Sequence, residues 1–162
     1  MSGRLERMSD PCAVAHGDAR APESSRALVA VFATPVSDYL IKFGADLGFR
    51  TSCYDPADAA ALPPLDEHTD VVVTNHHRDE LGPVLRDVLA HPVRWVGVMG
   101  NPRHPGPHVE ALKQLGVPAE DIERVHRPVG LNIGSRTPPE IALATLAGLI
   151  ADRNARPGGF GF

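Results

Sequence analysis

The chain has 162 residues, of which 43% are apolar and only 5% aromatic, and its formal net charge is −4. This length suits one domain that can bury a core, and that core must be built mainly from Val, Leu, Ile and Ala. The acidic balance argues against a broad nucleic-acid surface, and no apolar run approaches the roughly 18–20 residues that cross a membrane.

Two cysteines, Cys12 and Cys53, are far apart and form no C-x-x-C motif. This spacing argues against a thiolate metal site and against a disulfide framework. We expect Cys53 to be buried, because it sits inside an apolar run. The N-terminal residues contain no hydrophobic signal core, so the sequence predicts a cytoplasmic protein.

The composition divides the chain into three parts. Residues 1–26 are rich in Ser, Arg, Glu, Pro and Gly without an apolar period, which predicts a disordered N-terminal tail. Residues 156–162 predict a flexible C-terminal tail for the same reason. Residues 27–155 remain as the predicted domain.

Short apolar runs alternate with helical periodicity inside that domain. The expected elements, in chain order, are strand Leu28–Phe32, helix Val36–Leu47, strand Arg50–Tyr54, strand Asp70–Thr74, helix Arg78–Ala90, strand Arg94–Met99, helix Pro107–Leu115, strand Val125–His126 and helix Pro139–Arg153. The alternation predicts a Rossmann-like α/β fold, with a mostly parallel sheet and helices on both faces. Ligands of such sheets bind at the carboxyl ends of the strands, so we expect the site in the loops there.

The turn after the first strand departs from the usual dinucleotide-binding pattern. A G-x-G-x-x-G turn lets the backbone approach a pyrophosphate, whereas residues 32–37 contain no glycine and Pro35 lacks an N–H. Thr34 is a candidate ligand in this turn. Asp55, after the second strand, has the position of a ribose-binding acid. The alternative is a purely structural turn on a Rossmann scaffold.

Histidines follow the third and fourth predicted strands. His76 could bind a metal, shuttle a proton or contact a phosphate, or its loop could simply cap the next helix. His104 and His108 have the i, i+4 spacing of a helical zinc site, but Pro-Gly-Pro lies between them and argues against a continuous helix. We therefore expect no metal. In the same loop Gly100 permits close backbone approach, and Asn101 and Arg103 supply polar and positive groups.

Residues 128–142, Pro-Val-Gly-Leu-Asn-Ile-Gly-Ser-Arg-Thr-Pro-Pro-Glu-Ile-Ala, carry the strongest signal. The glycines permit unusual backbone angles, the Arg136 guanidinium suits a phosphate, and the helix from Pro139 would direct its positive end to the same place. The candidate ligands here are Asn132, Gly134, Ser135, Arg136 and Thr137. The alternative is a helix-entry loop in which Arg136 pairs with Glu140.

The chain resembles the Rossmann-like C-terminal domain of the XdhC/CoxF family. The resemblance rests on residues 128–142, on Leu47-Gly48-Phe49-Arg50 leading to Asp55, and on Val96-Gly97-Val98-Met99-Gly100. The resemblance implies an accessory protein, a chaperone rather than an enzyme, for maturation or insertion of molybdenum cofactor into a xanthine or carbon monoxide dehydrogenase-type enzyme. It implies molybdopterin or its nucleotide form as the bound cofactor. It also implies a molybdenum hydroxylase apoenzyme as partner, and a homodimer.

The chain departs from the family pattern in several places. Phe32-Ala33-Thr34 stands where the family has a Gly-Ala-Gly-like turn, and Asn132 replaces an aspartate. The loop Gly100–His104 carries less positive charge than the family's Gly-Ser-Arg-Arg-Lys. No N-terminal domain with a functional cysteine is recognised, which implies a separate cysteine-containing XdhC N-terminal domain protein as a partner. The alternatives are a degenerate NAD(P)-binding oxidoreductase-like protein and a non-catalytic interaction module with a vestigial pocket.

Overall fold

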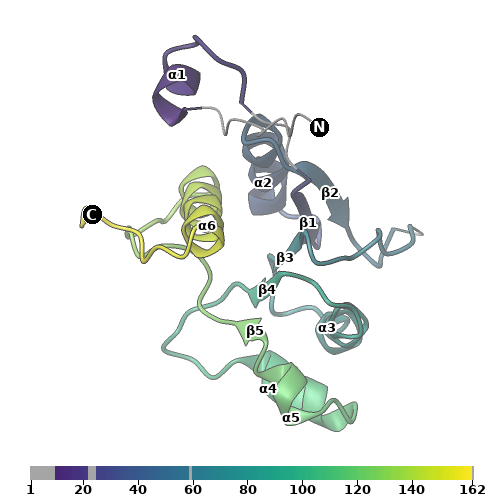
Figure 1. The fold of residues 1–162 in the computed structure, drawn as a ribbon. Helices are drawn as coiled ribbons and strands as arrows, with labels where there is room; N and C mark the ends of the chain where they lie inside the picture. Colours follow the sequence, from purple (N-terminus) through teal and green to yellow (C-terminus); the bar gives the residue numbers. More distant parts are fainter. Residues whose placement is uncertain (1–9, 22–24, 59, 162) are drawn as a thin grey trace.

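The computed structural model describes residues 10–21, 25–58 and 60–161. Five parallel strands form one sheet in the order β2-β1-β3-β4-β5 (Figure 1). The strands are β1 (Ala27–Val31), β2 (Arg50–Tyr54), β3 (Thr69–Val73), β4 (Trp95–Val98) and β5 (Val125–His126). The predicted parallel α/β architecture is confirmed. Strand order reverses between β1 and β3, so the topological switch point lies at their carboxyl ends.

Helices cover both faces of the sheet. The helices α2 (Pro35–Asp46) and α6 (Pro138–Arg153) cover one face, and α3 (Leu81–Leu89) and α4 (Pro107–Gln114) cover the other (Figure 1). Two short helices, α1 (Pro11–Ala15) and α5 (Ala119–Ile122), complete the described elements. The loops that follow the strands at their carboxyl ends therefore lie between two helical layers.

Strand β1 shows how the sequence builds two cores. Leu28 and Ala30 pack with the α2 and α6 side chains, whereas Val29 and Val31 pack with those of α3. Successive side chains of a strand point to opposite faces, so one apolar run serves both layers. All four residues are at most 2% exposed, as expected for a central strand of a parallel sheet.

At the amino end of β3, the buried carboxylate of Asp70 holds two arginines. Its Oδ1 accepts a hydrogen bond from Arg94 Nε at 2.6 Å, and its Oδ2 accepts one from Arg153 Nε at 3.1 Å. Arg94 also donates to Asp152 Oδ2 at 2.6 Å. This network ties β3 to the entry of β4 and to the last turn of α6.

The N-terminal segment differs in one respect from the predicted disordered tail. Residues 10–21 include helix α1, and the Asp10 side chain accepts a hydrogen bond from the N–H of Cys12 at its start. Positions 1–9 and 22–24 of the predicted tail lie outside the described residues. The predicted domain boundaries stay a prediction.

Two other expectations change. Cys53 is exposed rather than buried, because β2 is an edge strand whose outer residues face solvent. The helix predicted from Arg78 begins at Leu81, because the residues before it form the turn that carries an ion pair described below. In the part of the chain that the structure describes, no helix has both the length and the apolar character to span a bilayer.

Candidate functional site

The turn between β1 and α2 uses its own backbone donors. The N–H of Ala33 donates to Asp55 Oδ2 at 3.0 Å, and the N–H of Thr34 donates to Ser37 Oγ at 2.7 Å. The N–H of Ser37 donates in return to Thr34 Oγ1 at 3.2 Å, which completes a capping box. Pro35 has no N–H to offer. The donors that a glycine-rich turn presents to a pyrophosphate are thus engaged within the protein.

Phe32 keeps the backbone shape of a glycine turn but adds a buried ring. Its φ is +71°, in the left-handed region that favours glycine. Its side chain is 0% exposed and packs in the core on the α3 side of the sheet. The guanidinium of Arg78 lies 4.6 Å from the ring centroid, a cation–π distance. The ring therefore gives this turn a structural role.

Asp55 forms a bidentate ion pair with Arg78 at the carboxyl end of β2. The two oxygen–nitrogen distances are 3.0 and 2.9 Å, and Arg78 also donates to Glu80. The hydrogen bonds from Arg78, and those from the N–H groups of Ala33 and Ala57, hold the pKa of the Asp55 carboxyl well below its usual range. Both oxygens of the predicted ribose-binding acid are therefore committed to internal partners.

This ion pair predicts how stability depends on pH. The pKa of Asp55 is depressed in the folded state, so its contribution to stability is complete above its unfolded value of about 4 and is lost as the pH falls below it. We expect Asp55→Asn to destabilise the protein clearly at pH 7 and progressively less between pH 4 and pH 2. Urea unfolding of both proteins at pH 7, 4, 3 and 2 measures this difference. A difference that stays constant with pH would contradict the assignment.

Arg127, which follows β5, organises the loop between β4 and α4. Its guanidinium donates to the carbonyl oxygens of His104 at 2.7 Å and of Asn101 at 3.1 Å. A Cβ at Gly100 would collide with this guanidinium, so a larger residue there would have to displace Arg127 from the loop. The Asn101 side chain accepts a hydrogen bond from the N–H of Arg103 at 2.9 Å. The Arg103 side chain is exposed.

Two histidines near this loop, His76 and His108, have lowered pKa values. Burial, followed by the charges of His77 and Arg127, lowers the pKa of His76. Burial and Arg127 also lower the pKa of His108, which is 5% exposed. His104 precedes α4, so the i, i+4 pair does not share a helix. Among the described residues, no group of three or more His, Cys, Asp or Glu side chains could hold a metal ion.

The glycine-containing loop after β5 packs backbone to backbone on α6. Gly130 has a φ of +90°, and a Cβ on it would lie 3.1 Å from the carbonyl carbon of Ala144. The N–H of Leu131 donates to the carbonyl oxygen of Ala144 at 3.0 Å. On the helix side, a Cβ on Gly148 would lie 3.3 Å from the Cα of Gly130. The two glycines therefore allow the loop to cross the helix closely.

The start of α6 is occupied by an internal carboxylate. Glu140 Oε2 accepts hydrogen bonds from the N–H groups of Arg136 at 3.0 Å and Thr137 at 3.3 Å, which lower the Glu140 pKa. Arg136 thus contacts Glu140 through its backbone N–H, and its side chain is exposed. Because the carboxylate already interacts with the positive helix end, an anion at this position would have to displace it.

The predicted ligands fall into three groups in the structure. Thr34 and Asp55 lie at the ends of β1 and β2, where Thr34 Oγ1 also hydrogen-bonds to Thr74 Oγ1 at 3.0 Å. Gly100 and Asn101 contact Arg127 in the loop after β4, and His76, in the loop after β3, lies near enough for the Arg127 charge to affect its pKa. The hydrogen bonds of residues 132–137 stay within their own loop and α6.

Sequence reasoning missed the two arginines that organise the first two of these groups, Arg78 and Arg127. Both follow a strand directly or within one short loop. A cation at the carboxyl end of a parallel strand was the signal that could have indicated them.

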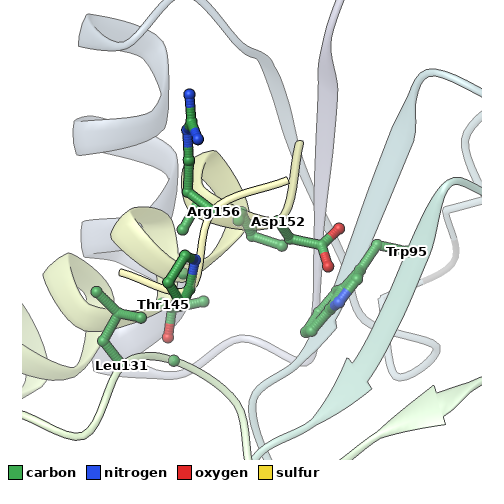
Figure 2. Close-up of a pocket in the computed structure, with 10 residues that line it drawn as sticks. Trp95, Leu131, Thr145, Asp152 and Arg156 are labelled. Atoms are coloured by element: carbon green, nitrogen blue, oxygen red, sulfur yellow. The ribbon is translucent and has the colours of Figure 1, made fainter. Parts of the chain in front are cut away.

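A separate cavity of about 230 Å³ lies between β4 and α6 (Figure 2). Its lining includes Trp95, Leu131, Thr145, Asp152 and Arg156. Trp95 stacks on His126, with ring centroids 5.0 Å apart. None of the predicted ligands is among its lining residues. One wall is made by Arg156 and Pro157, which follow α6.

Comparison with protein families gives a match over most of the chain. The family model described as the XdhC Rossmann domain matches residues 28–149. This range begins in β1 and ends in α6, so it contains all of the sheet except Ala27, and all of the predicted ligands.

Two individual proteins are similar to parts of the chain. YqeB, an uncharacterized protein of Escherichia coli strain K12, is 36% identical over 103 residues, which are 62% of this chain and 18% of YqeB. A crystal structure of a Bacillus halodurans protein, described as a xanthine dehydrogenase, superposes with a TM-score of 0.65 at 22% identity and covers 83% of this chain and 46% of its own. The chain thus spans less than half the length of either relative, and the second likeness shows the fold alone.

Proposed function

The chain belongs to the XdhC family, and from this premise we propose that it is an accessory protein of a xanthine dehydrogenase-type molybdenum hydroxylase. The observation that carries the proposal is the match to the XdhC Rossmann domain over residues 28–149. The description of its structural relative as a xanthine dehydrogenase supports the same association. In this role the protein holds molybdopterin or its nucleotide form and passes it to the hydroxylase apoenzyme.

The loop between β4 and α4 is the part of the predicted site that best fits a phosphate. Gly100 lets the Arg127 guanidinium lie close to the backbone of this loop, and Arg103, three residues later, has an exposed side chain. Arg127 holds the loop from below, and its Nε is buried without a hydrogen-bond partner among the described residues. This polar, positively charged environment suits an anionic group.

The other two loops fit a phosphate less well. The N–H groups of Ala33 and Thr34 are engaged in the first turn, and those of Arg136 and Thr137 are engaged by Glu140. The first of these facts also disfavours an NAD(P)-binding protein, because such proteins present that turn to the pyrophosphate. We therefore place the phosphate of the cofactor at the β4–α4 loop.

The proposal is tested by titrating the purified protein with molybdopterin, with its cytosine and guanine nucleotides, and with NADPH, read by thermal shift and native mass spectrometry. We expect binding of a molybdopterin species and none of NADPH. Arg103→Ala should weaken that binding by roughly 10- to 100-fold, because a hydrogen bond to a charged group is lost. The matched control is Arg86→Ala, an exposed arginine on α3 paired with Asp87.

The outcomes separate the parts of the proposal. Equal binding by the Arg103 and Arg86 variants would move the phosphate away from the β4–α4 loop. Binding of NADPH alone would favour the oxidoreductase-like alternative. Failure of every ligand to bind, together with failure to capture a molybdenum hydroxylase, would overturn the accessory role.

A further inference from the structure

An apolar groove runs between α2 and α6 on the outer side of the sheet. It encloses about 270 Å³ and is lined by Phe43, Asp46, Leu47, Leu143, Leu146, Ala147 and Ile150. Leu143 is 57% exposed and Leu47 is 39% exposed, so two large aliphatic side chains of this groove face solvent. An apolar cavity of about 150 Å³ is large enough for a benzene molecule. The groove can therefore accept an aromatic ring.

The segment 156–161, Arg-Pro-Gly-Gly-Phe-Gly, carries a phenylalanine ring that does not pack against the rest of the described chain. We call it the Gly-Phe segment. Phe160 is fully exposed. Gly158 lies against Leu131, to which a Cβ would come within 2.9 Å, so the segment runs back along the loop after β5. Phe160 is thus presented to solvent two residues beyond an anchored position.

The groove and the Gly-Phe segment lie on opposite sides of α6. At about 100° per residue, Leu143, Ala147 and Ile150 share one face of the helix, and the residues beside the segment, Gly148 and Asp152, lie about 180° away. Figure 1 agrees, since the chain after α6 lies on the side away from α2.

This arrangement prevents the ring from filling the groove of its own chain. Two residues beyond Gly158 extend the chain by at most about 7 Å. An α-helix with its side chains is about 10–12 Å wide. The segment would have to leave Leu131 to go round α6, so Phe160 can fill such a groove only in another molecule.

We propose that Phe160 of one copy of the chain inserts into the α2–α6 groove of a second copy. Two copies that exchange their Gly-Phe segments fill both grooves and close the assembly with two-fold symmetry. Charge complementarity supports the match: Asp46 is the charged residue among those lining the groove, and Arg156 is the charged residue of the segment. The exchange also buries Leu47 and Leu143, the exposed apolar residues of the groove.

The first test measures self-association by analytical ultracentrifugation over a range of concentrations. We expect a dimer whose dissociation constant rises at least about 100-fold in Phe160→Ala, because two buried rings are lost per dimer. Leu143→Asp should have a similar effect by placing a charge in the groove. The matched control is Leu115→Asp, since Leu115 is as exposed as Leu47 but lies after α4. Melting curves check that all variants remain folded.

A mixing experiment tests the exchange itself. The Phe160→Ala chain keeps an intact groove but has no ring to insert, and the Leu143→Asp chain keeps the ring but has a charged groove. Neither variant can therefore make the contact with itself. In a mixture, Phe160 of the Leu143→Asp chain can insert into the groove of the Phe160→Ala chain, which restores one of the two contacts of the dimer. Native mass spectrometry should detect a heterodimer in the mixture and no homodimer of either variant alone. A monomeric wild type, a dimer unaffected by Phe160→Ala, or a mixture without heterodimer would each overturn the proposal.

Discussion

Replacing Asp70 by alanine should lower the free energy of unfolding by about 3–5 kcal/mol, because the change removes the buried carboxylate that Arg94 and Arg153 share and leaves Arg94 with the half-exposed Asp152. Asp70 is 0% exposed, and its two oxygens take hydrogen bonds from Arg94 and Arg153. Both arginines are mostly shielded from water, with side-chain exposures of 20% and 14%. Water can therefore replace the lost carboxylate only in part. Chemical denaturation, with the slope checked for two-state behaviour, measures the change.

The control for this prediction is Asp87→Ala. Asp87 pairs with Arg86 at 3.4 Å, but both side chains are about half exposed. An exposed pair contributes only about 0–1 kcal/mol, so this variant should remain close to the wild type. Similar losses in the two variants would show that burial does not determine the strength of the Asp70 network.

Phe32→Gly should destabilise the protein by about 1–4 kcal/mol even though it relieves backbone strain. Loss of a buried phenylalanine side chain costs about 3–5 kcal/mol. Glycine at a φ of +71° recovers roughly 1–2 kcal/mol of the cost of a left-handed residue, which is less than the packing that is lost. Packing therefore outweighs strain at this position. Thermal or urea unfolding of the variant measures the result.

Phe32→Ala separates the two effects. Alanine loses the same packing but keeps the strained backbone, so we expect it to be about 1 kcal/mol less stable than glycine at this position. This order is the reverse of the usual one in strands and helices. Alanine as stable as glycine would show that the left-handed conformation carries no strain.

The sheet and its helices could be predicted because their signals are local. Apolar runs such as Val71-Val72-Val73 and the helical spacing before Gly116 indicate strands and helices regardless of what packs on them. The burial of Cys53 was wrong because an apolar run does not reveal whether its strand lies at the centre or the edge of the sheet. The short helices α1 and α5 were missed because four or five residues carry no measurable period.

The candidate site was harder to predict because its arrangement depends on contacts between distant residues. Asp55 was expected to meet a ribose, but only the folded chain brings Arg78 to it from 23 positions away. Arg127 hydrogen-bonds to Asn101, which is 26 positions away in the sequence, and no local pattern predicts that contact. The sequence could thus indicate which loops carry polar groups but not which of those groups are already paired.

The packing of α6 against α2 has a consequence for the order in which the protein folds. The core on the α3 side is complete once the chain has been made as far as Val125. The other core joins Leu28 and Leu40 to Leu146 and Leu149, near opposite ends of the described chain. During synthesis from the N-terminus, one face of the sheet can therefore close early. The other face remains an open hydrophobic surface, and a site for chaperones or aggregation, until its final helix has been made.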